Sequence, residues 1–398
     1  MRAARFLLAL LLAAPAAGGS AGAAEIELVP LLEELSFPTN MAFTPDGRLL
    51  FTEKETGAVR VVTPRGELLD RPFVTLPVIP DAERGLLGIA VHPDFERSPW
   101  VYLYHSDPAD GRNRLVRVSA EGSVSSGAPS TLLDGVTAAA GYHNGGDLVF
   151  GSDGTLFVSV GEAHDPDRAQ DERDIGGKIL RLTPDGRVPA GAPFGRDNPV
   201  WSLGHRNSFG LCVDPATGQL WETENGPDRD DEVNLVEAGG NYGWPAVTGR
   251  IDDGRWIDPV AVFDEPIAPT GCAVVGDTLW FGSFDGRLRR MPTSGGSPAE
   301  AASFPSGVTD VAFDRGRLYV ATADSIWTID LRTRATATTA PTPGGASPGP
   351  PPSPRDETED GAGRSWIAAA AFVALAGALG VRFVAGRRSQ RRRPDPPT

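Results

Sequence analysis

The chain lacks several signatures that identify large classes of enzymes. It has no haem attachment motif, no glycine fingerprint of a Rossmann nucleotide site and no serine-centred nucleophile elbow. Lysine is nearly absent: of 37 basic residues, only Lys54 and Lys178 are lysines. Acidic residues number 52, which gives a formal net charge of −15. A surface this acidic repels a phosphate backbone, so we expect no nucleic-acid partner.

The two ends of the chain have the composition of targeting segments. Arg2 and Arg5 precede an apolar run, and small residues continue to Ala24, so residues 1–24 are expected to be a secretory signal peptide. Residues 366–386 are long and apolar enough to cross a bilayer, and the arginine-rich residues 387–398 follow directly. Positive clusters stay on the cytoplasmic side, which predicts a single-pass protein of the cell membrane with its body outside the cytoplasm.

The rest of the chain divides into a body and a linker. Residues 334–365 are rich in proline, serine, threonine and glycine and contain too few apolar residues to build a core. This composition predicts a disordered stalk. Residues 25–333 remain for the folded part, which is long enough for one large all-β domain.

Repeated segments within residues 25–333 indicate the architecture. Each segment consists of an apolar strand, a tight turn and a second strand, as in "MAFTPDGRLLFTE" and "LVFGSDGTLFVSVGE". The six copies start at Met41, Ile89, Leu148, Leu211, Cys272 and Val311. Several are followed by a third alternating strand, such as "GAVRVV" or "GKILRL", with no helical period between the repeats. The pattern predicts an all-β, six-bladed β-propeller, which protects its strand edges by closing into a ring.

The two cysteines, Cys212 and Cys272, open equivalent strands of neighbouring repeats. An even number of cysteines in an exported protein favours a disulfide. A disulfide also requires Cα atoms within about 7 Å, and equivalent strands of adjacent blades can lie farther apart. The sequence therefore leaves a disulfide and two buried thiols as alternatives.

Polar residues stand where the chain enters two consecutive blades. His143 precedes Gly145 and Gly146 in "GYHNGGDLVF", and His205, Arg206 and Asn207 occupy the matching place in the next blade. A single histidine at a strand entrance is usually structural. An arginine beside an amide suits a polar or anionic ligand, however, so a base and an electrophilic clamp could meet at the channel mouth.

An ordered set of motifs resembles the soluble glucose/sorbosone dehydrogenase family. The set comprises "GLLGIAVHPDF", "HNGGDLVFGSDGTLFVSVGE", "AQDERDIGGKILRLTPDG", "VWSLGHRNSFGLCVDPATGQLW", "DDEVNLVEAGGNYGWP" and "IAPTG". The resemblance runs from about residue 36 to residue 329. It implies a six-bladed propeller that uses pyrroloquinoline quinone (PQQ) and calcium to oxidise aldose sugars, and that passes the electrons to an acceptor which the sequence does not identify.

The resemblance also assigns roles to individual residues. His143 would be the base that takes the proton of the anomeric hydroxyl, while hydride passes to the quinone. Arg206 would stabilise negative charge near the quinone and substrate oxygens, and Asn207 would contact the cofactor. Calcium would bind to Glu232 and the backbone carbonyl of Tyr242. The residues around Glu232 are dense in oxygen ligands, although such an acidic run is more often a solvated loop.

Several positions differ from the family pattern. Glu83 stands where other members have a glutamine that contacts the quinone, and Asp285 stands at the apparent position of a lysine, with Arg287 nearby as a substitute cofactor contact. An arginine pair is replaced by Gly307 and Thr309. Because PQQ carries three carboxylates, fewer cations would weaken its binding. Two alternatives therefore stand beside the dehydrogenase: a non-catalytic propeller that binds carbohydrate or protein, and a calcium-dependent hydrolase or lactonase with His143 as its base.

Overall fold

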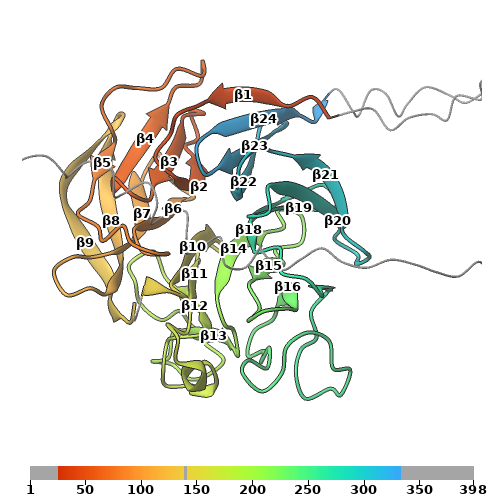
Figure 1. The fold of residues 1–398 in the computed structure, drawn as a ribbon. Coiled ribbons are helices and arrows are strands. Elements are labelled where there is room, and N and C mark those ends of the chain that lie inside the picture. Colours follow the sequence, from red (N-terminus) through yellow and green to blue (C-terminus); the bar gives the residue numbers. More distant parts are fainter. Residues whose placement is uncertain (1–25, 139–140, 333–398) are drawn as a thin grey trace, which may run out of the picture.

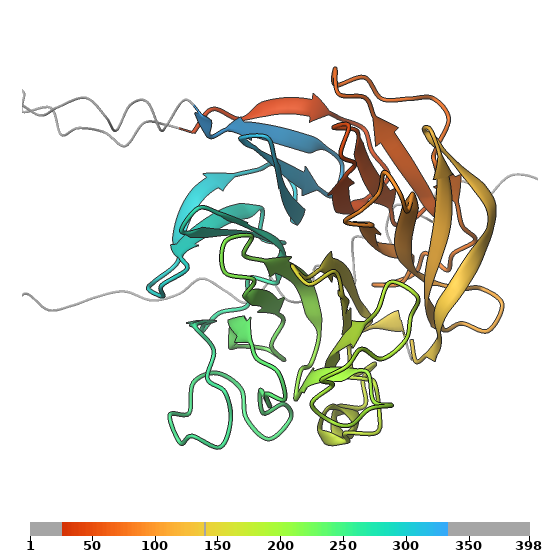
Figure 2. The same cartoon turned by 180° about the vertical axis from the view of Figure 1, so that it is seen from behind.

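Six four-stranded antiparallel sheets are arranged as blades around a central channel, so the predicted six-bladed propeller is confirmed (Figures 1 and 2). The computed structural model describes residues 26–138 and 141–332. The first strand of each blade contacts the first strands of both neighbouring blades, which closes the ring around the channel. All six repeats found in the sequence coincide with the first two strands of a blade.

The blades follow the order of the chain. Blade one comprises β2 Pro38–Phe43, β3 Leu49–Glu53, β4 Ala58–Val62 and β5 Val74–Thr75. Blade two comprises β6 Leu86–Val91, β7 Trp100–Ser106, β8 Asn113–Glu121 and β9 Val124–Val136. Blade three comprises β10 Gly145–Phe150, β11 Leu156–Val160, β12 Lys178–Leu182 and β13 Val200–Leu203. Blade four comprises β14 Ser208–Val213, β15 Leu220–Glu224, β16 Asp231–Val236 and β17 Ala261–Phe263. Blade five comprises β18 Pro269–Val275, β19 Thr278–Ser283, β20 Arg287–Pro292 and β21 Ala299–Ser303. Blade six comprises β22 Val308–Asp314, β23 Arg317–Thr322, β24 Ile326–Asp330 and, from the other end of the chain, β1 Val29–Leu32.

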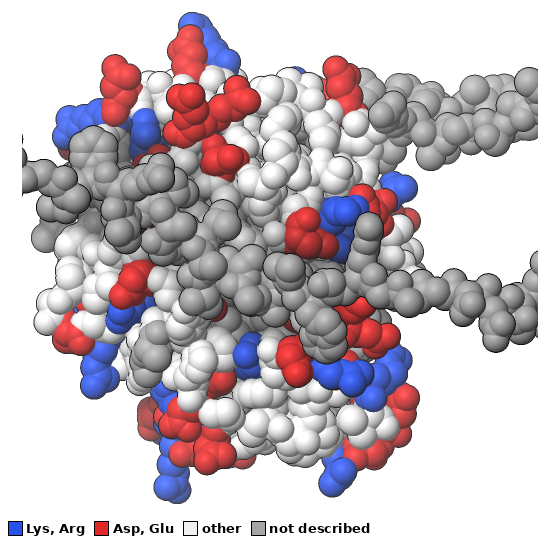
Figure 3. All heavy atoms as spheres, in the orientation of Figure 1, with Lys and Arg blue, Asp and Glu red and all other residues white. Residues whose placement is uncertain are grey.

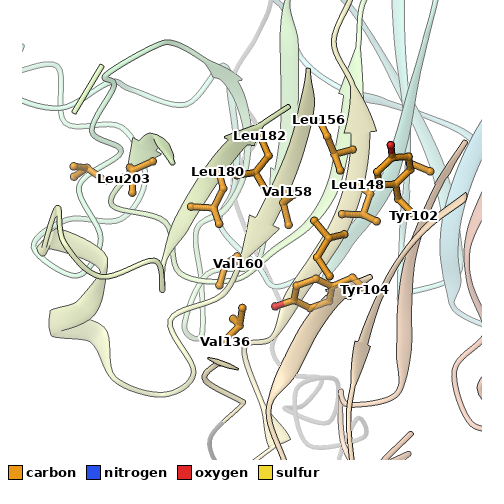
Figure 4. Close-up of a cluster of buried hydrophobic side chains, with 13 residues drawn as sticks. Tyr102, Tyr104, Val136, Leu148, Leu156, Val158, Val160, Leu180, Leu182 and Leu203 are labelled. Atoms are coloured by element: carbon orange, nitrogen blue, oxygen red, sulfur yellow. The ribbon is translucent and has the colours of Figure 1, made fainter. Parts of the chain in front are cut away.

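The hydrophobic core lies between neighbouring blades. In blade three, every residue of β11 is buried, because each face of this sheet packs against another blade. Figure 4 shows the layer between blades two and three, where Tyr102 and Tyr104 of β7 lie against Leu148 of β10 and Leu156 of β11. The turn between β10 and β11 contains Gly154 at φ 78°, a conformation that glycine adopts readily.

Polar side chains on the innermost strands join one blade to the next. The register of each innermost strand shifts near its start. Close to these bulges, the carboxylate of Asp147 accepts a hydrogen bond from the backbone of Leu211 in blade four at 2.6 Å. Asp310 accepts one from the backbone of Met41 in blade one at 2.8 Å. The starts of the innermost strands are thereby held at fixed positions around the channel.

Two further links fasten the ring. β1 pairs antiparallel with β24, so the start of the chain completes the last blade (Figure 1). A disulfide joins Cys212 of β14 to Cys272 of β18, with the Cα atoms 5.6 Å apart. The sequence left this pairing open, because equivalent strands of two blades could stand too far apart. They are close enough here because innermost strands converge on the channel.

The segments predicted at the chain ends lie outside the described residues. This applies to the signal peptide at 1–24, the stalk at 334–365, the membrane helix at 366–386 and the basic tail at 387–398. Within residues 26–138 and 141–332, no helix has the length and apolar character that a membrane crossing requires. The charged side chains visible on one face of the propeller lie mainly around its rim, with acidic and basic residues interspersed (Figure 3).

Candidate active site

His143 and Glu162 form a buried pair in the loops that enter and leave the first hairpin of blade three. The Nδ1 atom of His143 lies 2.7 Å from Oε1 of Glu162, and both residues are buried. Because an ionised carboxylate can only accept, Nδ1 carries the proton and Nε2 keeps its lone pair. The ring of His164 stacks on that of His143, with centroids 4.1 Å apart. The imidazole is therefore held in one orientation with a nitrogen available as a base.

The backbone at His143 adopts an unusual conformation that neighbouring blades support. Its φ is 55°, in the left-handed region that non-glycine residues rarely occupy. Glu83, from the loop before blade two, accepts a hydrogen bond from the His143 backbone N–H at 2.7 Å. The backbone carbonyl of His143 accepts one from Ala163 at 3.1 Å. The strained peptide is thus fixed on both sides, as is common at functional sites.

The two glycines after His143 allow close contacts. At Gly145 a Cβ would lie 2.8 Å from the backbone nitrogen of Gly161, and at Gly146 it would lie 2.7 Å from the ring of Tyr104. Both glycines also have positive φ values, 59° and 111°. Larger residues would push this segment away from blade two, so the glycines set the position at which His143 enters the site.

Glu83 and Asn207 connect the loops of three blades around His143. The side-chain amide of Asn207 donates to Oε2 of Glu83 at 3.3 Å, and its carbonyl oxygen accepts from the backbone of Gly145 at 3.3 Å. Burial raises the pKa of the Glu83 carboxyl, although the hydrogen bonds from His143 and Asn207 oppose this shift. Glu83 and Asn207 therefore hold the loop that contains His143 in place.

Arg206 lies next to this group, at the entrance of blade four. Its Nη1 donates to the carbonyl of Asn225 at 3.0 Å, and its guanidinium lies 5.5 Å from the ring centroid of Trp244. Burial lowers the pKa of Arg206, and the attraction of Glu162 and Glu224 opposes that shift. Within the described residues no carboxylate forms a direct ion pair with Arg206, so most of its N–H donors remain available for a ligand.

A cavity of about 80 Å³ lies at the top of the channel, and residues of all six blades line it. We call it the channel cavity and define it by Phe37, Lys54, Glu83, Gly146, Phe284 and Thr309. Phe37 comes from blade one and Phe284 from blade five, and their rings stack with centroids 6.2 Å apart. The hydroxyl of Thr309 is buried and has no hydrogen-bond partner within the part of the chain that the structure describes. Flat apolar walls with a few unsatisfied polar groups are typical of a ligand site.

Of the candidate cofactor contacts, Glu83 lines this cavity, Asn207 is bonded to Glu83 and Arg206 lines the neighbouring small cavity, whereas Arg287 lines neither. Its guanidinium forms an ion pair with Glu300 on the adjacent strand β21 and is largely exposed. Asp285 is paired with Arg289 at 2.7 Å. The charges that these two residues carry are therefore neutralised within blade five.

A second, very small cavity of about 10 Å³ adjoins Arg206, and both predicted calcium ligands, Glu232 and Tyr242, line it. The acidic run is only partly a solvated loop, because Asp231 and Glu232 are buried whereas Asp228 is exposed. Burial and repulsion by Glu224 raise the pKa of Glu232 to about 8. A cation would relieve that repulsion, and the space holds about one atom of its size.

Glu232 belongs to a buried polar cluster with His205 and three residues that the sequence analysis missed, Glu222, Glu224 and Asn234, of which Glu224 lines the cavity. His205 Nδ1 lies 3.0 Å from Glu222 and 3.3 Å from Glu224. Burial lowers the pKa of His205, but the attraction of the two carboxylates outweighs it and raises the pKa to about 10. Asn234 donates to Glu222 and Glu232, and its own carbonyl oxygen is buried without a partner.

The strand register explains this cluster. Glu222 pairs with Asn234 and Glu224 pairs with Glu232 across β15 and β16, so all four side chains share one face of the ladder. The sequence did contain a signal for this cluster: polar residues two apart in "ETE" (222–224) and "EVN" (232–234). Residues two apart in a strand point to the same side, so each pair is expected on one face. The cluster's carbonyl and carboxylate oxygens are the donors that calcium prefers.

The two largest of the other cavities contain none of these groups. One of about 660 Å³ lies at the outer edge, where β1 meets blade one, and is lined by Val29, Phe43 and Tyr319 among others. The other, of about 680 Å³, is open to solvent beside Arg250. Neither includes a residue next to His143, whereas the channel cavity is lined by Gly145 and by Glu83, which accepts the hydrogen bond from the His143 backbone.

Comparisons with known proteins relate the chain to sugar dehydrogenases. The family model described as Glucose / Sorbosone dehydrogenase matches residues 35–289. The quinoprotein glucose dehydrogenase B of Acinetobacter calcoaceticus is 31% identical over 255 residues, which are 56% of this chain and 53% of that protein. An aldose sugar dehydrogenase of Escherichia coli K12 is 32% identical over 248 residues, which are 58% of this chain and 65% of that one.

A solved structure extends the similarity to the whole fold. The PQQ-bound aldose sugar dehydrogenase of Streptomyces coelicolor matches with a TM-score of 0.70 and 31% identity. The match covers 77% of this chain and 99% of that one.

Proposed function

The chain belongs to the glucose/sorbosone dehydrogenase family, and from this premise we propose that it is a PQQ- and calcium-dependent aldose sugar dehydrogenase. The reaction would oxidise the anomeric hydroxyl of the sugar to a lactone. The observation that carries the proposal is the His143–Glu162 pair, which lies next to Arg206 and the channel cavity. The Nδ1 atom of His143 lies 2.7 Å from the Glu162 carboxylate, which leaves Nε2 to act as the base.

The residues of the channel cavity fit a carboxylate-bearing edge of a planar anionic cofactor. Phe37 and Phe284 offer aromatic faces, Gly146 leaves the backbone open to close approach, and the Thr309 hydroxyl lacks a partner among the described residues. Lys54 and Arg206 add positive charge on two sides of Glu83. These groups would hold the quinone, which when bound supplies the acceptor for the hydride of the sugar.

The protein's own residues would handle the proton and the developing charge. His143 Nε2 takes the proton from the anomeric hydroxyl, and the Glu162 carboxylate stabilises the resulting imidazolium through Nδ1–H. Arg206 donates to the oxygen on which negative charge develops, from a buried position where such hydrogen bonds are strongest. The stacked ring of His164 covers one face of His143 and keeps water from it.

Calcium fits the small cavity lined by Glu232 and Tyr242. Glu232 supplies a carboxylate and Tyr242 a backbone carbonyl, and the buried Asn234 amide oxygen provides a further donor close by. The ion would neutralise part of the repulsion between Glu224 and Glu232, and would fix the loop that carries Arg206's contact Asn225.

Reconstitution tests the proposed function. The purified protein is incubated with PQQ and calcium, and the oxidation of glucose and a panel of other aldoses is followed with a reducible dye as electron acceptor. We expect oxidation that requires both additions. If no aldose is oxidised although the protein is folded, the dehydrogenase assignment is wrong and the non-catalytic binding propeller takes its place.

We also propose that the propeller is exported and tethered by residues 366–386, with its C-terminus in the cytoplasm. The composition of residues 1–24 and 366–398 supports this topology. Protease added to intact cells should then remove the propeller and leave a short membrane fragment. Survival of the propeller on intact cells, with degradation after lysis, would show the opposite orientation.

A further inference from the structure

Lys54 is a largely buried cation at the channel cavity, with no hydrogen-bond or ion-pair partner in the part of the chain that the structure describes. It follows β3 and lines the cavity, and only 7% of its surface is exposed. Its Nζ lies 5.2 Å from the ring centroid of Phe37. Within residues 26–138 and 141–332, no hydrogen bond or ion pair is made by this amine. The stem of the lysine is thus buried, while its ammonium faces the cavity, where a ligand could supply the hydrogen-bond acceptors that the protein does not.

Lys178, the only other lysine, shows what a structural lysine looks like in this fold. Its Nζ donates to the carbonyls of Arg168 and Gly176, both at 2.7 Å. Burial lowers the pKa of Lys54 as well, while the attraction of Glu55, Asp81 and Glu83 opposes this shift. Lys54 thus keeps its donors free, whereas Lys178 has used them.

The backbone around Lys54 fixes the direction of its side chain. The N–H of Lys54 donates to Phe37 at 3.0 Å, and its carbonyl accepts from Leu86 at 3.2 Å. At Gly85, which has φ +147°, a Cβ would lie only 2.6 Å from Cγ of Lys54. Because glycine has no Cβ, Gly85 leaves room for the aliphatic part of the Lys54 side chain to reach the cavity.

We propose that Lys54 binds a carboxylate of the cofactor in the channel cavity, an inference that rests on the proposed function. The free groups on the cavity wall are donors: the ammonium of Lys54 and the hydroxyl of Thr309. Most acceptors there are already used, because Asp147 is bonded to Asn40 and Leu211, and Oε2 of Glu83 accepts two hydrogen bonds. A wall that offers donors and few free acceptors suits an anion better than a sugar hydroxyl.

The size of the cavity and the charge around it are consistent with this role. About 80 Å³ takes a carboxyl group and the carbon atoms beside it, not a whole tricyclic quinone. The positive charge that the family pattern places at positions 285, 307 and 309 is missing from this chain, where Arg287 and Arg289 are paired with acidic neighbours. Instead, Lys54 supplies a cation from blade one, which adjoins blade six.

Equilibrium binding of PQQ tests the proposal. PQQ is titrated into the full-length protein with calcium present, tryptophan fluorescence is recorded at low and high ionic strength, and three variants are compared with the wild type. Lys54→Met should raise the dissociation constant for PQQ roughly tenfold or more and flatten its salt dependence, since a charged hydrogen bond is lost. Lys54→Arg should bind almost as well as the wild type. Arg97→Met removes an equal charge from an exposed site and should change neither quantity.

Thermal unfolding without PQQ provides the second readout. Lys54→Met should melt at the same temperature as the wild type or higher, because it removes an unpaired buried charge. If Lys54→Met binds PQQ as tightly as a wild type that oxidises sugar, the inference is wrong and the proposed function stands. If Lys54→Met melts earlier and Lys54→Arg does not restore binding, Lys54 is structural. If the wild type binds no PQQ, both proposals are wrong.

Discussion

The Nδ1 atom of His143 lies 2.7 Å from the carboxylate of Glu162, on the far side of a hairpin whose innermost strand faces the channel. The two residues flank β10 and β11, so their distance is set by the pairing of Gly145 with Val160. The same hairpin brings the backbone carbonyl of Arg206 to the N–H of Glu162 at 3.0 Å. Base, orienting carboxylate and arginine are therefore held by backbone contacts as well as by their side chains.

His143→Asn should abolish most of the activity and leave the fold intact. Asparagine tolerates the left-handed φ of 55° better than most residues, so the loop keeps its conformation. The rate of aldose oxidation should fall about a hundredfold or more, as for a lost general base. Glu162→Gln should lower the rate by a smaller factor, because the base remains. A variant that melts much earlier, with unchanged activity per folded molecule, would make His143 structural.

Arg206→Lys should also impair the reaction, although the charge is retained. An ammonium cannot donate to Asn225 and to a substrate oxygen in the planar arrangement of a guanidinium. We expect the rate constant for oxidation to fall about a hundredfold, as when a donor to a developing oxyanion is removed. The exposed Arg65→Lys is the matched control and should be fully active. Equal activity of the two variants would remove Arg206 from the mechanism.

Calcium removal should destabilise the wild type but hardly the Glu232→Gln protein. A bound ion stabilises the folded state by mass action, so chelation should lower the melting temperature of the wild type by roughly 5 °C. Glu232→Gln keeps the size of the side chain but loses the charge that binds calcium. The exposed Glu237→Gln of the same blade should remain as sensitive as the wild type. If all three proteins respond equally, the ion binds elsewhere.

Lys178 predicts a specific dependence of stability on pH. Burial lowers its pKa in the folded protein from 10.5 to about 8, although Asp174 opposes the shift. Between these values the unfolded chain binds more protons, so this group stabilises the fold increasingly as pH rises from 8 to 10.5. The free energy of unfolding of the wild type, relative to Lys178→Met, should rise by up to about 3 kcal/mol across that range. Denaturant unfolding at several pH values measures it, and a constant difference would contradict the prediction.

The fold could be predicted because each blade is encoded locally. A strand, a turn and a second strand lie within about fifteen residues, and Met41, Leu148 and Val311 mark the same place in three of the repeats. The cysteine pairing could not be decided in this way. It depends on how closely two innermost strands approach, and the sequence does not give that distance.

The site could be predicted only in part, because its contacts join different blades. His143, Arg206 and Asn207 stand out at strand entrances, and the structure brings them together. The bond from His143 to Glu83 spans 60 residues, so its existence could not be read from either local segment. Lys54 gave no signal at all, because an isolated lysine after a strand is usually solvated.

The pairing of β1 with β24 has a consequence for how the ring is completed during synthesis. The strand that is made first occupies the outer edge of the blade that is made last. While the chain emerges, β1 has no partner strand, and blade six lacks its outer edge until Asp330 has been added. Assembly of the ring therefore cannot finish before β24 has been made, and a chain halted before β24 leaves both ends of the sheet array open to pairing with other chains.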